Sequence, residues 1–65
     1  MAVKQLWKAT IGFGPVVSDP IPNPMPPAPT WQNSLSAAVK SGEDYLKLLE
    51  VRGAYFTVES HYLWQ

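Results

Sequence analysis

The chain has 65 residues, of which 46% are apolar and 15% charged, and its five basic and five acidic side chains cancel to a formal net charge of zero. A chain of this length forms at most one small domain and buries only about 60% of the surface that its unfolded form exposes, which argues against a self-sufficient multi-step enzyme. Because the sequence has no cysteine, neither a disulfide framework nor a thiolate zinc site supplements the small core.

The charge pattern also limits the class of partner. The basic residues are spread from Lys4 to Arg52, so they form no basic cluster for nucleic acid. No apolar run approaches the roughly 20 residues that span a bilayer, and the first residues lack the apolar stretch of a secretory signal. We therefore expect no nucleic-acid partner, no membrane partner and no secretion by a signal peptide, which is consistent with a cytoplasmic location.

The first predicted element is a strand within residues 1–17. From Ala2 to Phe13 the side chains alternate between a largely apolar face and an amphipathic one, and a period of two indicates a strand. The run Gly12-Phe-Gly-Pro15 weakens or bends this strand, because glycine permits unusual backbone angles and proline removes a ladder donor. We expect Val16 and Val17 to resume extended structure briefly.

A proline-rich arm follows in residues 18–30. All seven prolines of the chain lie between Pro15 and Pro29, and six of them fall within residues 20–29. Proline lacks an amide donor and pushes the preceding residue to extended angles, so the arm is expected to be a polyproline II segment. At ~3.1 Å per residue, residues 20–29 reach on the order of 30 Å, comparable to the width of the domain.

Residues 31–65 are predicted to form a helix–strand unit. Apolar or small residues recur there at helical spacing: Leu35, Ala38, Val39, Gly42, Leu46 and Leu49. Three candidate N-caps precede them: Thr30, Asn33 and Ser34. Gly42 leaves one helix or two as alternatives. We favour two short helices with a kink, in which Lys40-Ser41-Gly42 ends the first and Ser41 caps the second through Glu43 and Asp44.

A second strand is predicted after Arg52-Gly53, because residues 54–64 are rich in aromatic and β-branched side chains. The alternative is one long helix from Glu43 to Trp64, which Gly53 and the Thr57-Val58 pair disfavour. The predicted class is therefore a small α+β domain, ordered as strand, extended arm, one or two short helices and strand. We expect it to be largely non-globular without a partner.

Side chains that carry chemistry are few. Glu59 and His61 stand two residues apart, so on a strand they share a face and can form an acid–base pair. Two residues do not make a catalytic or metal site, and an exposed pair on a polar strand face is the simpler interpretation. We expect no catalytic residue, no cofactor and no metal site.

The arm and the aromatic residues are the candidates for partner binding. The predicted contact residues are Trp7, Ile21, Met25, Pro26, Pro27, Trp31 and Trp64. The segments Pro24-Met-Pro-Pro27 and Pro26-Pro-Ala-Pro29 match the PxxP pattern, but no charged residue lies between Asp19 and Lys40 to orient such a ligand. We interpret the arm as a docking segment rather than a spacer, with Trp31 as its anchor.

Two resemblances bear on function. The string Trp7-Lys-Ala-Thr-Ile11, followed by Leu35, Ala38, Gly42 and Tyr45, resembles small strand–helix–strand proteins of phages and actinobacteria. The plan of a tiny neutral domain with a long Pro-rich arm is similar to minor capsid and decoration proteins of tailed phages, which implies a virion component. Neither resemblance assigns a role to a particular residue.

The sequence therefore predicts a non-enzymatic structural protein that docks on a larger protein assembly, such as a capsid or tail protein or copies of itself. Two alternatives remain. The chain can be a small accessory subunit of an enzyme complex, or an adaptor that presents its prolines to a recognition domain.

Overall fold

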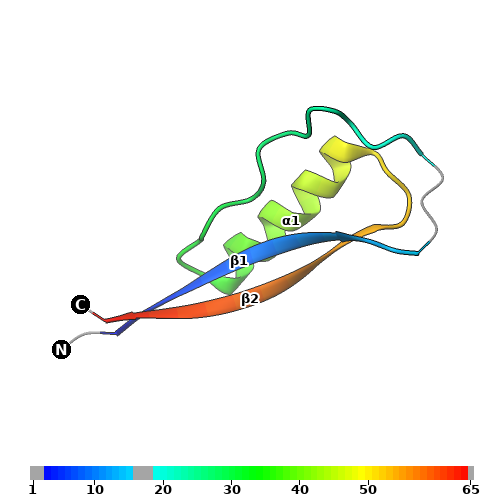
Figure 1. Cartoon of the computed structure of the whole chain (residues 1–65). Helices are drawn as coiled ribbons and strands as arrows, with labels where there is room; N and C mark the ends of the chain where they lie inside the picture. Colours follow the sequence, from blue (N-terminus) through cyan, green and yellow to red (C-terminus); the bar gives the residue numbers. More distant parts are fainter. Residues whose placement is uncertain (1–2, 16–18, 65) are drawn as a thin grey trace.

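The computed structural model describes residues 3–15 and 19–64, and the described chain contains strand β1 (Val3–Phe13), helix α1 (Leu35–Leu49) and strand β2 (Ala54–Trp64) (Figure 1). The predicted α+β class and the order strand, arm, helix, strand are confirmed. The extended structure expected at Val16 and Val17 lies outside the described residues.

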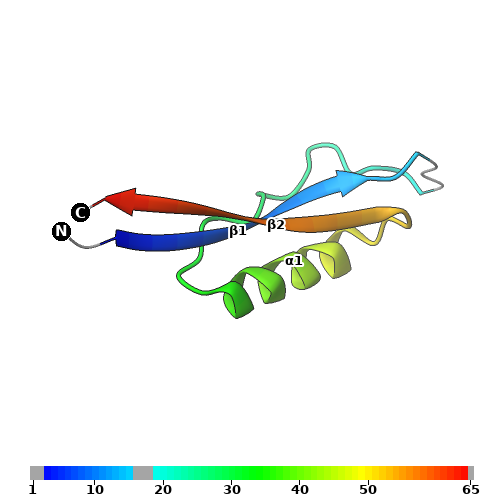
Figure 2. The same ribbon diagram turned by 90° about the horizontal axis from the view of Figure 1, so that it is seen from below.

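The two strands pair with each other, although the arm and the helix separate them in the sequence. They run antiparallel, in a register from Val3 opposite Trp64 to Phe13 opposite Ala54. Helix α1 lies against one face of the two strands (Figure 2). We call the opposite face the open face. Because side chains alternate along a strand, the open face carries Lys4, Leu6, Lys8, Thr10 and Gly12 from β1 and Tyr55, Thr57, Glu59, His61 and Leu63 from β2.

Helix α1 is continuous through Gly42, so the favoured pair of kinked helices is wrong. Ser34 is the N-cap, and its side chain accepts a hydrogen bond from the Ala37 N–H at 3.2 Å. Ser41 caps no second helix. Its hydroxyl instead donates to the Ala38 carbonyl one turn back at 2.7 Å, a bond that a helix interior tolerates.

The reason for Gly42 is packing. A Cβ atom at this position would lie 2.6 Å from Cδ2 of Phe56 on β2, so only glycine lets the helix approach the Phe56 ring this closely. Ala38, one turn earlier on the same stripe, is fully buried. The core continues toward the end of α1 as a cluster of Tyr45, Leu49 and Val51, against which Ile11, Phe13 and Ala54 pack.

The chain leaves α1 through two left-handed residues. Glu50 is the C-cap, with φ 54° and an N–H that donates to the Leu46 carbonyl at 3.1 Å, and Gly53 follows with φ 92°. The Gly53 carbonyl then accepts from the Gly14 N–H at 2.8 Å, which ties this turn to the end of β1. The alternative of one long helix from Glu43 to Trp64 is therefore wrong.

The arm runs back beside α1 and along the outer edge of β1, opposite in direction to β1 (Figure 1). The Asn23–Pro24 peptide within it is cis. The described molecule is elongated, with extents of 48 × 20 × 18 Å. No helix in residues 3–15 and 19–64 is long and apolar enough to cross a bilayer.

Candidate protein-interaction surface

Three contacts fasten the arm to the rest of the molecule, and the first is at its start. A carboxylate oxygen of Asp19 accepts from the backbone N–H of Arg52 at 2.8 Å, and the guanidinium of Arg52 adds contacts at 3.3 and 3.4 Å. Hydrogen bonds from the Arg52 backbone and side chain hold the pKa of Asp19 below its ordinary value. Asp19 therefore joins the arm to the turn between α1 and β2.

The second contact is in the middle of the arm. The hydroxyl of Tyr45, a buried residue of α1, donates to the Pro26 carbonyl at 2.7 Å. A proline-rich segment has few amide donors but keeps all its carbonyls, so a hydroxyl is a suitable partner for it. The Tyr45 ring thus lies against the core while its polar end fixes the arm.

The third contact pairs Gln32, just after the end of the arm, with β1. Trp7 and Gln32 exchange two backbone hydrogen bonds, with N···O distances of 2.9 and 2.7 Å. This short antiparallel pairing brings the neighbouring Trp31 onto the open face beside Lys8. The Lys8 ammonium lies 4.8 Å from the centre of the Trp31 ring, and the ring of His61 is 5.8 Å away at 44°. A cation over the face of an indole is an attractive contact.

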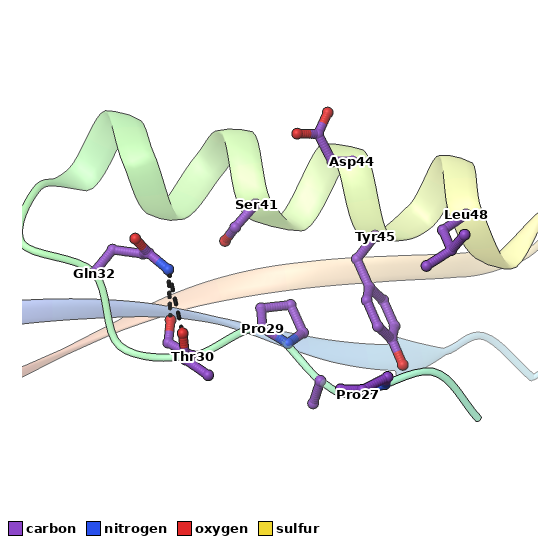
Figure 3. A pocket seen from close by; sticks show the side chains of 9 residues that line it. Pro27, Pro29, Thr30, Gln32, Ser41, Asp44, Tyr45 and Leu48 are labelled. Carbon is purple, nitrogen blue, oxygen red and sulfur yellow. Dashed lines mark hydrogen bonds between the residues drawn. The ribbon is translucent and has the colours of Figure 1, made fainter. Parts of the chain in front are cut away.

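An open groove of about 350 Å³ separates the arm from α1 (Figure 3). Tyr45 and Leu48 of the helix and Pro27 and Pro29 of the arm provide much of its apolar lining. Near one end, the Gln32 side-chain amide donates to the carbonyl and hydroxyl of Thr30 at 3.3 and 3.4 Å. The groove therefore has a mixed apolar and polar lining, contributed by α1 and by the arm with the residues that follow it.

A second pocket, of about 320 Å³, lies between the arm and β1. Met25 and Pro29 line it from the arm, Ile11 and Phe13 line it from β1, and Tyr45 also lines the first groove. The second pocket is more enclosed and more apolar than the first. Enclosure and an apolar lining are general features of pockets that bind small apolar groups.

The predicted contact residues do not form one continuous patch. Ile21, Met25 and Trp31 are each 40 to 45% exposed along the arm. Pro27 is exposed at the first groove, whereas Pro26 is half-buried and its carbonyl is occupied by Tyr45. Trp7 is half-buried on the helix-covered face of β1, and Trp64 stands opposite Val3 at the far end of the sheet, away from the arm.

Glu59 and His61 share the open face, as predicted, but each has a different neighbour. A Glu59 carboxylate oxygen lies 3.6 Å from the Lys8 ammonium, and His61 packs against Trp31. Both side chains are exposed on a strand surface rather than enclosed in a pocket. Within residues 3–15 and 19–64, no group of three or more His, Cys, Asp or Glu side chains is placed to hold a metal ion.

The sequence prediction did not identify Tyr45, Gln32, Asp19 or Arg52 as the residues whose contacts fasten the arm. Tyr45 fits the helical stripe, three residues after Gly42, and its polar end was the available signal, because a buried tyrosine hydroxyl requires a partner. Asp19 and Arg52 are 33 residues apart, and no local pattern links such a pair. Comparisons with protein-family models, curated proteins and solved structures found no match to this chain.

Proposed function

We propose that this chain is a non-enzymatic structural protein that docks on a larger protein assembly through the arm and the aromatic residues beside it. One observation carries the proposal: among the described residues, nine large apolar side chains are exposed, whereas only five apolar residues are buried. The exposed set is Val3, Ile21, Met25, Trp31, Leu35, Leu48, Tyr55, Tyr62 and Leu63. Trp31 in this set is of a residue type that often anchors protein interfaces.

The fastened arm favours docking over a flexible tether. It is held by the Asp19 side chain and by the backbones of Pro26 and Gln32. Ile21, Met25 and Trp31 therefore project from a segment that is already fastened. A partner that binds these side chains loses less conformational entropy than one that must order a mobile loop. Contacts with Lys8 and His61 further restrict the orientation of the Trp31 ring. Trp31 is therefore a preorganised anchor.

A co-purification experiment from the natural host tests the proposal. The wild-type chain, Trp31→Ala, Met25→Ser and Leu63→Ser carry the same affinity tag, and the retained proteins are quantified by mass spectrometry. Leu63 is the matched control, since it is 39% exposed but lies near the far end of β2. We expect one protein to be retained by the wild type and by Leu63→Ser, and to be at least tenfold depleted with Trp31→Ala, because truncating an anchor costs about 2 kcal/mol.

Equal retention by all four chains contradicts docking through the arm. Circular dichroism of each variant shows that a lost partner reflects a lost contact rather than a lost fold. If retention falls with Leu63→Ser and stays with Trp31→Ala, the contact surface lies at the end of the hairpin instead.

A further inference from the structure

The outer edge of β2 differs from that of β1. The β1 edge is covered in part by the arm, through the Trp7–Gln32 pairing, whereas β2 pairs only with β1 within the described chain. An uncovered edge strand presents a row of backbone donors and acceptors that can pair with another strand. Lysine and proline commonly protect such edges, and residues 54–64 contain neither. The free edge of β2 is therefore suited to strand addition.

The hydrogen bonds of β1 identify which β2 groups point outward. Trp7 uses both its N–H and its C=O for Gln32, on the side away from β2. Trp7 and its β2 partner Ser60 are therefore a non-hydrogen-bonded pair, in which the backbone groups of both residues point away from the other strand. Since this direction alternates along a strand, the outward groups of β2 belong to Phe56, Val58, Ser60 and Tyr62.

We propose that a second copy of this chain adds to the free edge of β2, antiparallel and with Ser60 opposite Ser60 of the second copy. A two-fold axis perpendicular to the sheet places one residue opposite its own counterpart. With Ser60 at the axis, Glu59 stands opposite His61 of the second copy on the open face. This is the register in which the acidic and the imidazole side chain meet, and opposite residues on one face interact directly.

The neighbouring register is unfavourable. An axis at Glu59 sets two carboxylates directly opposite each other, which is destabilising. In the Ser60 register the Lys8–Glu59 ion pair of 3.6 Å is instead extended to His61 of the second copy. Of these two registers, only the Ser60 register sets the Glu59 carboxylate opposite a side chain that can donate a hydrogen bond to it.

The helix-covered face supports the same arrangement. The Ser60 register places Tyr62, which is 58% exposed, opposite Val58 of the second copy. Leu48 of α1 lines the groove beside the arm, and Leu46 is roughly 160° around the helix from it. Leu46 therefore lies on the flank of α1 that is turned away from the arm, and this flank also carries Val39 and Leu35. Leu35, at the start of the helix, is 51% exposed. The midlines of the two strand pairs would be about 10 Å apart, a spacing at which two helices fit side by side.

Strand addition would also enlarge, and so stabilise, the two-stranded sheet. An isolated pair of strands is marginally stable in water, and three or more strands with a covered face are more stable. The second copy would convert two strands into four, in the order β1-β2-β2-β1. The arm lies at the opposite edge, so this pairing leaves it accessible and stands independently of the proposed docking function.

Disulfide trapping tests the register. The chain has no cysteine, so Ser60→Cys introduces a single thiol at the proposed axis. Opposite residues of a hydrogen-bonded pair have Cα atoms about 5.5 Å apart, within the range that a disulfide spans. Thr57→Cys is the matched control on the same strand. It would be opposite residue 63 of the second copy, six residues and about 20 Å from its own counterpart.

We expect mild oxidation to link Ser60→Cys into dimers several times faster than Thr57→Cys. Equal rates for the two variants overturn the proposed register. Sedimentation of the unmodified chain in the micromolar to submillimolar range should give twice the monomer mass, and a monomer throughout that range overturns the proposal.

Ser60→Pro provides a second variant that tests the edge itself. The Ser60 N–H points outward, so proline there removes a donor to the second copy without removing a β1–β2 hydrogen bond. We expect a monomer with an unchanged circular dichroism spectrum. A Ser60→Pro chain that stays dimeric with wild-type affinity contradicts pairing at this edge.

Discussion

Two glycines of this protein lie directly against aromatic rings, one on each face of the sheet. Gly42 of α1 faces Phe56, and Gly12 of β1 faces Tyr55, where a Cβ atom would lie 2.7 Å from the ring. Tyr55 and Phe56 are consecutive on β2, so their rings cover opposite faces of the hairpin. At both sites the missing side chain provides space that the ring fills.

Gly42→Ala is expected to destabilise the protein, although alanine favours a helix over glycine by about 1 kcal/mol. The added Cβ would lie 2.6 Å from the Phe56 ring, and such overpacking costs about 1–3 kcal/mol. Urea unfolding followed by circular dichroism should show a net loss of about 1 kcal/mol. The same change in a Phe56→Leu background provides the control, where alanine should be neutral or stabilising. A higher unfolding midpoint for Gly42→Ala alone would mean that the ring moves away without cost.

At the scale of elements, the arm is fastened to the rest of the fold mainly by polar contacts, because its prolines prevent it from forming a continuous ladder of backbone hydrogen bonds. Six prolines in residues 20–29 remove most amide donors from this stretch. The arm therefore depends on its carbonyls, on Asp19 at its start and on the Gln32 backbone just after its end. Each contact comes from a different element: α1, the turn before β2, and β1.

Tyr45→Phe should loosen the middle of the arm. The change keeps the buried ring but removes the hydroxyl that donates to the Pro26 carbonyl at 2.7 Å, and the loss of one such hydrogen bond costs about 1 kcal/mol. Tyr55→Phe is the control, since Tyr55 is half-exposed on the open face. Chemical denaturation should separate the two variants by about that amount. Equal stabilities would show that water replaces the Tyr45 hydroxyl at Pro26.

The Asp19 contact should make stability depend on acid pH. Because hydrogen bonds from Arg52 lower the pKa of Asp19 in the folded state, the carboxylate stabilises the fold above its unfolded pKa of about 3.9. This stabilisation is lost as the pH falls through the lower folded value. The difference in unfolding free energy between wild type and Asp19→Asn should be present at pH 6 and shrink toward zero below the folded pKa.

Arg52→Leu serves as the partial control for this titration. It removes the guanidinium contacts at 3.3 and 3.4 Å but keeps the backbone N–H donor at 2.8 Å, which contributes most to the lowered pKa. The difference in unfolding free energy between Arg52→Leu and the double variant Arg52→Leu/Asp19→Asn should therefore keep part of the pH dependence that is seen without the Arg52 change. A difference that does not vary with pH would show that Asp19 is not bonded to residue 52 in solution.

At the scale of the whole molecule, the fold is an elongated hairpin with a small core. Ala9, Ala38, Tyr45, Leu49 and Val51 are the buried apolar residues of the described chain, and two of these are alanines. A core of this size leaves a narrow margin between folded and unfolded states. We therefore expect the fastened arm to contribute a sizeable part of the stability of the molecule.

Replacing residues 20–29 by a Gly/Ser segment of equal length should destabilise the isolated chain. Each proline that fits its native conformation stabilises by about 0.4–1 kcal/mol through the unfolded state, so the loss of six is expected to cost on the order of 3 kcal/mol. Thermal unfolding followed by circular dichroism should show a lower midpoint or no cooperative transition. An unchanged midpoint would indicate that the arm adds nothing to the folded unit and acts as a tether.

Local sequence patterns predicted the elements of this protein well. The alternation before Gly12, the proline cluster and the helical stripe from Leu35 each depend on neighbouring residues, and the class and order that they predicted are confirmed. Ser34 was among the predicted N-caps for the same local reason. The error at Gly42 arose because a glycine within a helical pattern resembles a helix end unless the Phe56 ring opposite it is known.

The pairing of β1 with β2, the fastening of the arm and the composition of the open face were decided by the tertiary structure. Each joins residues far apart in the chain, such as Asp19 with Arg52, Pro26 with Tyr45, and Trp31 with His61. The sequence by itself determined which segments are extended or helical, because those preferences arise within a few residues. Which faces meet depends on how the whole chain buries its apolar surface, and no local pattern records that choice.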